Sequence, residues 1–348
     1  MTQQAQPALS TDSQVRLAAW LPQALAADSV AIRSAEKLAG GAVQENWRLD
    51  VVVSGGTRAG QHSWVLRTDS PARLSMSLDR IQEFACLRVA HAAGVRVAEP
   101  IIHCADLAII GRPFLIQDRL EGTAQGRRLV RDPALKDFGD VLAREIGQQM
   151  ALLHTIVPPR AELPFLTVPG APASAVVRQI RGMLDACTQP RPALEYILCW
   201  LEAKAPPARQ VVLVHGDLRT GNVMVDHGRM TGILDWEFCH WGDPREDIGW
   251  FCARCWRFGN DALEAGGLAA KSALLEGYNA RASHPVTAAE VDYWEVMAAA
   301  RWAAIAALQG DRFLKSGERS LELALTGLMP AEMEVDALEL IAAQRAGA

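Results

Sequence analysis

Three polar residues in the second half of the chain have the types and spacing needed for phosphoryl transfer. Asp217, Asn222 and Asp235 follow one another at intervals of five and thirteen residues, and short apolar runs separate them. Enzymes that transfer phosphoryl groups position a hydroxyl acceptor and stabilise the phosphate charge with Mg²⁺. An Asp on a loop can accept the hydroxyl proton, and carboxylate and amide oxygens are ligands that Mg²⁺ prefers. We therefore predict Asp217 as the catalytic residue and Asn222 and Asp235 as magnesium ligands. The alternative is a polar turn between two strands.

The full motif around these residues carries a family resemblance. The chain reads His215-Gly-Asp-x-x-x-x-Asn222, followed by Ile233-Leu-Asp-Trp-Glu237. This pattern resembles the aminoglycoside phosphotransferase (choline kinase-like) family, distant relatives of the protein kinases. The resemblance extends over roughly residues 15–345. It implies an ATP- and Mg²⁺-dependent kinase whose acceptor is a hydroxyl of a small molecule.

The family fold is α+β and bilobal, like that of the protein kinases, with a small N-lobe built on an antiparallel sheet and a larger, mainly helical C-lobe. We expect a disordered tail over 1–12, an N-lobe that binds the nucleotide over 13–118, and a C-lobe over 119–348 that holds the catalytic loop, the metal site and the acceptor site. Tandem repeats and low-complexity tracts are absent from the sequence, so no additional domain is predicted.

Two further residues near the motif are expected to support it. His215 is predicted to orient the catalytic loop through hydrogen bonds. Asp247 lies in Gly242-Asp-Pro-Arg-Glu-Asp-Ile-Gly-Trp250, which looks like the family's G-D-P-x-x-D element. There the acidic residue opens a helix and braces the loop backbone. His154 is interpreted as a packed structural residue.

The nucleotide site is expected in the first third of the chain. Gly40 and Gly41 precede a predicted strand, and a glycine turn allows the backbone to cover the phosphates. By the kinase resemblance, Arg67 in the strand Trp64–Arg67 binds the α- and β-phosphates and pairs with Glu83 on the next helix. The Arg stands where the wider superfamily has Lys. The alternatives are a plain hairpin turn and an exposed strand Arg.

The resemblance also predicts a hinge that binds adenine through its backbone. Gln117, Asp118 and Arg119 would form it, at the end of the last N-lobe strand. Backbone recognition leaves little trace in residue type, so these polar residues could equally be solvated hinge charges.

Residues near the motif are compatible with several kinds of acceptor. Tryptophans near the motif (Trp236, Trp241, Trp250, Trp256) could cage a quaternary ammonium, line an acyl groove, or simply fill the core. His240 and Trp241 are candidate acceptor contacts, and Glu237 is either a metal contact or structural. Basic residues are interspersed among acidic ones over 251–285. This balance disfavours a polycationic acceptor and suits an anionic acceptor such as a CoA ester. These basic residues are Arg254, Arg257, Lys271 and Arg281.

The V-L-R and D-W-E variants resemble the branch of the family associated with acyl-CoA dehydrogenases, which favours a hydroxyacyl-CoA as acceptor. The alternatives are an aminoglycoside, choline or another amino alcohol. Two other functions stay open: a catalytically silent nucleotide-binding module and a metal-dependent phosphohydrolase. The short gap from Asp235 to Gly242 predicts a site without a long activation loop.

Composition excludes several other classes of protein. The 348 residues are 50% hydrophobic and 22% charged, with a formal net charge of −5. That balance gives no reason to expect nucleic-acid binding. The sequence contains no run of 18 apolar residues and no signal-peptide pattern, so we predict no membrane association and a cytoplasmic location, as a monomer or homodimer. Seven scattered cysteines indicate free thiols, and a metal or redox role for the Cys252-x-x-Cys255 pair is the less favoured alternative.

Overall fold

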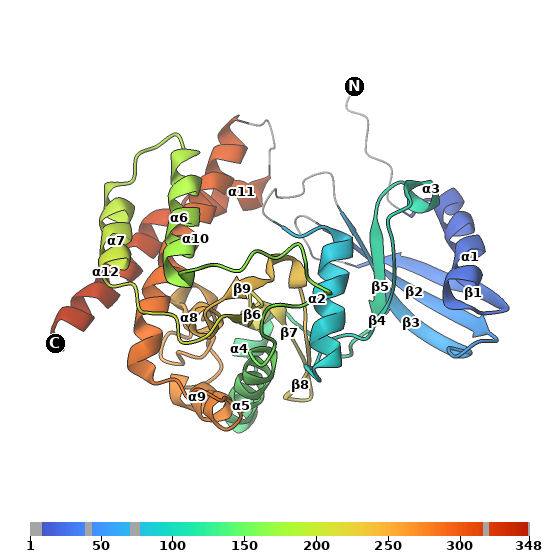
Figure 1. Ribbon diagram of the computed structural model, residues 1–348, viewed down its shortest axis with the longest axis horizontal. Helices are drawn as coiled ribbons and strands as arrows, with labels where there is room; N and C mark the ends of the chain where they lie inside the picture. Colours follow the sequence, from blue (N-terminus) through green and yellow to red (C-terminus); the bar gives the residue numbers. More distant parts are fainter. Residues whose placement is uncertain (1–8, 39–43, 70–76, 316–319, 347–348) are drawn as a thin grey trace. The chain divides into compact units, whose positions relative to one another are not determined.

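The structure, a computed structural model, describes residues 9–38, 44–69, 77–315 and 320–346 (Figure 1). The predicted glycine turn at Gly40 and Gly41 lies outside these residues, as does most of the predicted N-terminal tail. The chain divides into two compact units. The first, called here the N-terminal unit, comprises residues 1–121, 161–165 and 232–239; the rest forms the C-terminal unit. The N-terminal unit therefore includes the segment that carries Asp235.

A five-stranded antiparallel sheet forms the centre of the N-terminal unit, in the order β1-β2-β3-β5-β4. Side chains alternate between buried and half-buried along β2, where Trp47, Leu49, Val51 and Val53 all face the core. This period of two is the pattern of a sheet that covers an apolar core on one face. The strands are β1 (Ser29–Lys37), β2 (Gln44–Ser54), β3 (Gly60–Asp69), β4 (Pro100–Cys104) and β5 (Phe114–Asp118).

Helices pack on this sheet and complete the unit. The helix α1 (Thr11–Leu25) contacts β1 and the short α3 (Leu107–Ile110), and its Leu17 and Leu21 are fully buried in the same core as the sheet. The first turn of α1 begins at Thr11 and Leu9 is buried, so residues 9–12 belong to the folded part rather than to a tail.

The helix α2 (Arg80–Ala92) begins with a complete capping box, in which the Asp79 side chain accepts from the backbone N–H of Gln82 and Gln82 reaches back to Asp79. Such reciprocal bonds satisfy N–H groups that the first turn would otherwise leave unpaired. The helix packs against β3, β4, β5 and the short 3₁₀ helix η2 (Trp236–Phe238). The cap therefore fixes where α2 starts, and with it the position of Glu83 in the first turn.

The C-terminal unit is mainly helical. The long helix α10 is its centre and contacts α6, α7, α8, α11 and α12 (Figure 1). A second pair, α5 and α9, packs very closely: a Cβ at Gly147 would lie 2.2 Å from the carbonyl oxygen of Leu274. The helices are α4 (Gly126–Val130), α5 (Leu135–Leu153), α6 (Pro172–Asp185), α7 (Pro192–Ala203), α8 (Pro244–Cys252), α9 (Lys271–Asn279), α10 (Ala288–Lys315), α11 (Leu321–Thr326) and α12 (Pro330–Ala346).

Short strands of the C-terminal unit flank the part of the motif from His215 to Asn222. Strand β6 pairs antiparallel with β9, so that Val214 lies opposite His240. A 3₁₀ turn, η1, then leads into the β7–β8 hairpin. These elements are β6 (Val212–Val214), η1 (Thr220–Asn222), β7 (Val223–Asp226), β8 (Arg229–Ile233), whose last residues belong to the N-terminal unit, and β9 (His240–Gly242).

The predicted class of fold is confirmed: an antiparallel sheet in the N-terminal part and a mostly helical remainder. The predicted boundary between residues 118 and 119 stays a prediction, because the compact units follow contacts rather than chain order. Between η2 and β9 stands a single residue, Cys239, which leaves no room for a long activation loop. Among the residues described, none of the helices is long and apolar enough to cross a bilayer.

Candidate active site

The backbone of the loop after β6 is held by one buried carboxylate. Asp247, in α8, accepts hydrogen bonds from the backbone N–H groups of His215 (2.8 Å) and Gly216 (2.9 Å). Gly216 has φ +77°, a left-handed conformation that glycine adopts without strain. Burial opposes ionisation of Asp247, but the hydrogen bond and charge of His154 outweigh it, and the pKa of Asp247 is lowered. An ionised, immobile carboxylate therefore fixes the loop.

His154 and His215 both serve this arrangement in the structure. His154 places Nε2 3.2 Å from Oδ2 of Asp247 and Nδ1 3.0 Å from the hydroxyl of Tyr278. His215 is fully buried, and its Nδ1 accepts the backbone N–H of Asp217 at 3.2 Å. Neither imidazole is placed as a general base, because each is engaged with the loop or its supports.

Asp217 is the residue that the loop presents, and three donors orient its carboxylate. Oδ2 accepts from Nδ2 of Asn222 at 2.8 Å and from Nε of Arg219 at 3.3 Å. Oδ1 accepts from the indole N–H of Trp250 at 2.9 Å. Arg219 in turn lies over the ring of Trp256, 4.8 Å from its centroid. Charge-assisted hydrogen bonds of this kind hold a carboxylate in one orientation.

The amide of Asn222 is oriented by the same contacts. Its Nδ2 donates to both the backbone oxygen and Oδ2 of Asp217, at 2.8 Å each. Since the nitrogen is used as a donor, the carbonyl Oδ1 is the atom left to meet a cation. Oxygen donors of this kind fit Mg²⁺. Thr220 anchors the turn through a 2.6 Å hydrogen bond from Oγ1 to the carbonyl oxygen of Gly266.

In the N-terminal unit, Arg67 connects a helix, a strand and the segment that follows β8. Its guanidinium lies 2.9 Å from Oε1 of Glu83 and 2.7 Å from Oδ1 of Asp235, and it also donates to Gln44. Burial opposes the charge, but the carboxylates of Glu83 and Asp235 raise the pKa of Arg67. The strand Arg and the helix Glu are thus paired within this unit, together with the Asp assigned to Mg²⁺.

A second buried arginine lies beside the first. Arg80 is fully buried at the start of α2 and lies 2.9 Å from Asp69, 3.3 Å from Glu237, and in an ion pair with Glu83. Sequence reasoning missed Arg80, because nothing local distinguishes it from any other helix arginine. Its only sequence signal is its place three residues before Glu83.

Glu237 is tied to the protein by both its backbone and its side chain. Its carbonyl oxygen accepts the backbone N–H of Leu78 at 2.8 Å, and its carboxylate pairs with Arg80. Burial, together with the charge of Asp235, raises the pKa of Glu237. Asp235 has φ +65°, an uncommon conformation for a residue other than glycine. The structure therefore engages Glu237 with α2, and this contact favours the structural alternative.

The predicted hinge residues lie at the end of β5. Gln117 is buried in the sheet between β3 and β4, and the backbone N–H groups of Asp118 and Arg119 already donate to the carbonyl oxygens of Glu99 and Ser63. Arg119 also pairs with Glu121 at 3.1 Å. Adenine binding by this backbone stays a prediction, and these two N–H groups are occupied.

The candidate acceptor contacts differ in exposure. Trp241 is buried on β9 opposite Leu213, so its side chain belongs to the core. His240 is half-buried, and its Nε2 lies 3.2 Å from Oε2 of Glu246. The rings of Trp250 and Trp256 lie 5.4 Å apart with their planes tilted by 53°. Arginines already lie over both rings, Arg301 over Trp250 and Arg219 over Trp256. These rings do not form an open cage for a cationic ligand.

The basic residues that the sequence offered for an anionic acceptor are neutralised within the C-terminal unit. Arg254 pairs with Asp261 and Asp336, and Arg257 and Lys271 both pair with the buried Glu295. Three of the four basic residues over 251–285 therefore compensate acidic groups of the protein itself. The expectation that they would attract an anionic acceptor is corrected accordingly.

Comparison with known proteins identifies the family. The model of the "Phosphotransferase enzyme family" matches residues 34–284. The chain belongs to this family. It is accordingly an ATP-dependent phosphotransferase that acts on a hydroxyl group, which confirms the predicted enzyme class.

Sequence relatives of this phosphotransferase carry the name of a second enzyme. Acyl-CoA dehydrogenase family member 10 of Mus musculus is 26% identical over 206 residues, which are 56% of this chain and 18% of the relative. Acyl-CoA dehydrogenase family member 11 of Homo sapiens is 26% identical over 207 residues, 55% of this chain and 25% of the relative. The matched region thus spans a quarter or less of these relatives' length.

Solved structures share the fold of this phosphotransferase. A protein of Ralstonia eutropha assigned to the aminoglycoside phosphotransferases has a TM-score of 0.75 at 22% identity, with 94% of this chain and 97% of that chain covered. A choline/ethanolamine kinase family protein of Mesorhizobium loti has a TM-score of 0.59 at 18% identity, with 95% of each covered. Aminoglycoside phosphotransferase APH(4)-Ia, in a ternary complex with ADP and hygromycin B, has a TM-score of 0.55 at 14% identity, with 92% and 98% covered. At these identities the likeness concerns the fold.

Proposed function

We propose that this phosphotransferase transfers the γ-phosphoryl group of ATP directly to a hydroxyl of a small metabolite, with a hydroxyacyl-CoA as the preferred acceptor. The observation that carries the proposal is the carboxylate of Asp217, oriented by Asn222, Trp250 and Arg219 on a loop that Asp247 braces. Such a group suits the alignment of an acceptor hydroxyl, which is the main task of the protein in phosphoryl transfer.

In this mechanism Asp217 accepts a hydrogen bond from the acceptor hydroxyl and takes its proton late in the reaction. The three donors to its carboxylate set the direction from which the hydroxyl approaches. The phosphoryl group leaves ATP as its bond to the acceptor oxygen forms, and ADP is the second product.

The nucleotide would be held mainly by charge. ADP in the complex of APH(4)-Ia supports an adenine nucleotide. We assign Asn222, through Oδ1, and Asp235 as ligands of Mg²⁺, which when bound neutralises phosphate charge. Arg67 is assigned to the α- and β-phosphates, with Glu83 holding the guanidinium in place. Asn222 belongs to the C-terminal unit, and Arg67, Glu83 and Asp235 belong to the N-terminal unit.

Two observations favour a hydroxyacyl-CoA as acceptor. The sequence relatives are acyl-CoA dehydrogenase family members, although the chain spans a quarter or less of their length. The aromatic rings near Asp217 are covered by Arg219 and Arg301, which disfavours choline or another quaternary amine. Aminoglycosides, as in the hygromycin complex, are the second candidate class. A cytoplasmic location belongs to the same proposal, because all seven cysteines are free thiols.

An acceptor panel tests the proposal. Mg²⁺-dependent release of ADP from ATP is measured with 3- and 4-hydroxyacyl-CoAs, choline, homoserine, aminoglycosides and macrolides, and the Asp217→Asn protein serves as blank. We expect turnover with a hydroxyacyl-CoA. Turnover with another class alone would overturn the acceptor assignment and keep the kinase. Tight MgATP binding with no turnover on any acceptor would favour the nucleotide-binding module instead.

A further inference from the structure

Three arginines of the C-terminal unit form an exposed basic surface with no acidic partner among the residues described. Arg127 and Arg128 lie on α4 and Arg131 caps its end, and all three side chains are exposed. No ion pair or hydrogen bond of these guanidinium groups is found in the described parts of the chain, in contrast to the paired Arg254 and Arg257. We call this group the α4 arginines. In a chain of net charge −5, such a cluster points to an anionic ligand.

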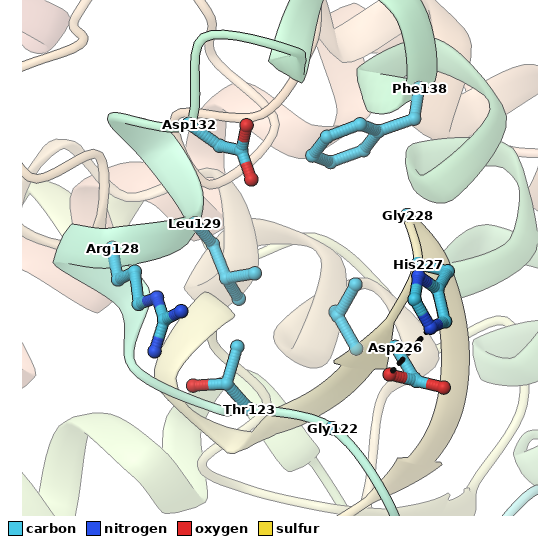
Figure 2. Close-up of a pocket in the computed structure, with 10 residues that line it drawn as sticks. Gly122, Thr123, Arg128, Leu129, Asp132, Phe138, Asp226, His227 and Gly228 are labelled. Atoms are coloured by element: carbon cyan, nitrogen blue, oxygen red, sulfur yellow. Dashed lines mark ion pairs between the residues drawn. The ribbon is translucent and has the colours of Figure 1, made fainter.

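Two adjoining hollows flank the α4 arginines, and Arg128 and Asp132 line both. The first hollow has a volume of about 470 Å³ and the second a volume of about 440 Å³. Arg127 and Arg131 also line the second hollow. Pockets of about 300–1,000 Å³ are typical for ligands of nucleotide size. Figure 2 shows the side chains of Arg128, Asp132 and Phe138 directed into the first hollow.

The first hollow combines apolar and polar walls. Leu129 and the ring of Phe138 supply apolar surface, and Thr123 and Arg128 supply polar groups. The acidic residues that face it are Asp132 and Asp226. Asp132 accepts the backbone N–H of Ala134 at 2.9 Å, and Asp226 lies 3.9 Å from His227. An aromatic ring beside a guanidinium suits a purine base with a phosphate attached nearby.

The α4 arginines lie on an element that packs directly on the catalytic loop. Helix α4 contacts η1, the turn that carries Asn222. Just before α4, Thr123 exchanges backbone hydrogen bonds of 2.9 and 3.0 Å with Val225 in the strand that leaves that turn. A Cβ at Gly221 would lie 3.9 Å from the carbonyl oxygen of Ala124. A ligand bound at α4 is therefore beside the loop of Asp217, within the same unit.

From this geometry we propose that the α4 arginines and the two hollows bind the 3′-phosphorylated ADP end of an acyl-CoA. The base occupies the hollow between Leu129 and Phe138, and the phosphates are bound by Arg127, Arg128 and Arg131. The pantetheine arm separates these phosphates from the acyl hydroxyl, so the phosphate site belongs next to the catalytic loop rather than in it. The inference rests on the proposed function, because it names how that acceptor is recognised.

Calorimetry with CoA and dephospho-CoA tests this site, with the protein saturated by ADP and Mg²⁺ so that the ATP site cannot bind the CoA nucleotide. We expect CoA to bind about tenfold more tightly than dephospho-CoA, because one charge-assisted phosphate contact has that value. Arg128→Ala and Arg131→Ala should each weaken CoA binding about tenfold. Arg178→Ala is the matched control, since Arg178 is exposed on α6 and also without an ion pair among the described residues.

The outcomes separate this site from the proposed function. Equal affinity for CoA in the wild type and the Arg127→Ala/Arg128→Ala/Arg131→Ala variant overturns the site, as does the absence of CoA binding by the wild type. If that variant also keeps the KM for a hydroxyacyl-CoA while the wild type turns it over, the acceptor assignment stands and only the phosphate site fails. A raised KM for the hydroxyacyl-CoA, with the KM for ATP unchanged, supports both.

Discussion

The indole N–H of Trp250 donates a 2.9 Å hydrogen bond to Oδ1 of Asp217, across 33 residues of sequence. Asn222 and Arg219 hold the other carboxylate oxygen, so both oxygens of the proposed catalytic group are fixed by neighbours within the C-terminal unit. Trp250 is itself buried between Trp256 and Arg301. The packing of α8 therefore sets the position of a donor to the Asp217 carboxylate.

Asp217→Asn should lower kcat by about 10²–10⁴-fold while the Kd for MgATP stays nearly unchanged. The amide keeps the shape of the side chain but cannot accept the proton of the acceptor hydroxyl, and general-base contributions of about 10²–10⁴ are typical. Single-turnover kinetics and calorimetry with an ATP analogue measure the two quantities. Asp185→Asn, an exposed change at the end of α6, is the control. Retention of most of the rate would remove Asp217 from the role of base.

Trp250→Phe should lower kcat roughly tenfold and leave the KM for ATP unchanged. Phe keeps most of the packing against Trp256 but lacks the N–H that orients Oδ1, and one charge-assisted hydrogen bond corresponds to about that factor. Urea denaturation distinguishes orientation from mere packing: losing the donor to Oδ1 should lower kcat without a matching loss of unfolding free energy. Trp200→Phe on α7 is the comparison, and a fall in kcat that only accompanies a loss of stability would contradict the assignment.

Arg67→Lys should raise the KM for ATP about tenfold with a smaller effect on kcat. The guanidinium bridges Glu83 and Asp235 at 2.9 and 2.7 Å, and a single ammonium cannot reproduce both contacts and still meet a phosphate. Initial rates at varied ATP and fixed acceptor give both constants. A change confined to the KM of the acceptor would argue that Arg67 does not bind the nucleotide.

Arg80→Met should destabilise the protein by about 3–5 kcal/mol, because it removes a buried cation from a cluster of three carboxylates. The partners concerned are Asp69, Glu83 and Glu237. Urea denaturation measures the loss, with the exposed Arg33→Met as control.

Adding Glu237→Gln to Arg80→Met should restore part of that stability, since one uncompensated carboxylate is removed. Additive free energies of unfolding for the two substitutions would show that Arg80 and Glu237 do not interact. If Glu237→Gln instead abolished Mg²⁺ dependence without affecting stability, its role would be that of a metal contact.

The contribution of Asp247 to stability should depend on pH. The pKa of Asp247 is lowered in the folded protein from its ordinary value of 3.8, so the folded state favours the ionised form. The resulting stabilisation is fully present above the unfolded value and is lost as the pH falls through the lower, folded value. The difference in unfolding free energy between the wild type and Asp247→Asn should therefore be constant from about pH 5 to 7 and shrink below about pH 4. A difference that stays constant down to pH 3 would contradict this assignment.

Several parts of the fold and the site were predictable because they depend on short stretches of chain. A strand was predicted after Gly40 and Gly41, and the kinase resemblance placed Arg67 on a strand and Glu83 on the next helix; the observed β2, β3 and α2 confirm these elements. The class of enzyme followed from one motif. In contrast, sequence reasoning took Arg254, Arg257 and Lys271 as available charges, and the structure pairs them with Asp261, Asp336 and Glu295.

The family, the type of chemistry and the loop in which Asp217 and Asn222 lie were predictable from one short motif. These two residues are five apart, and a single 3₁₀ turn brings their side chains to 2.8 Å, so local backbone geometry suffices. Which distant groups surround Asp217 and Glu237 depends instead on tertiary packing within each unit. Trp250 on Asp217 and Arg80 on Glu237 join positions 33 and 157 residues apart. Such contacts depend on how whole helices pack. The same holds for the α4 arginines, which have no ion pair within the part of the chain that the structure describes, because pairing of a charge is set by neighbours in space and not along the chain.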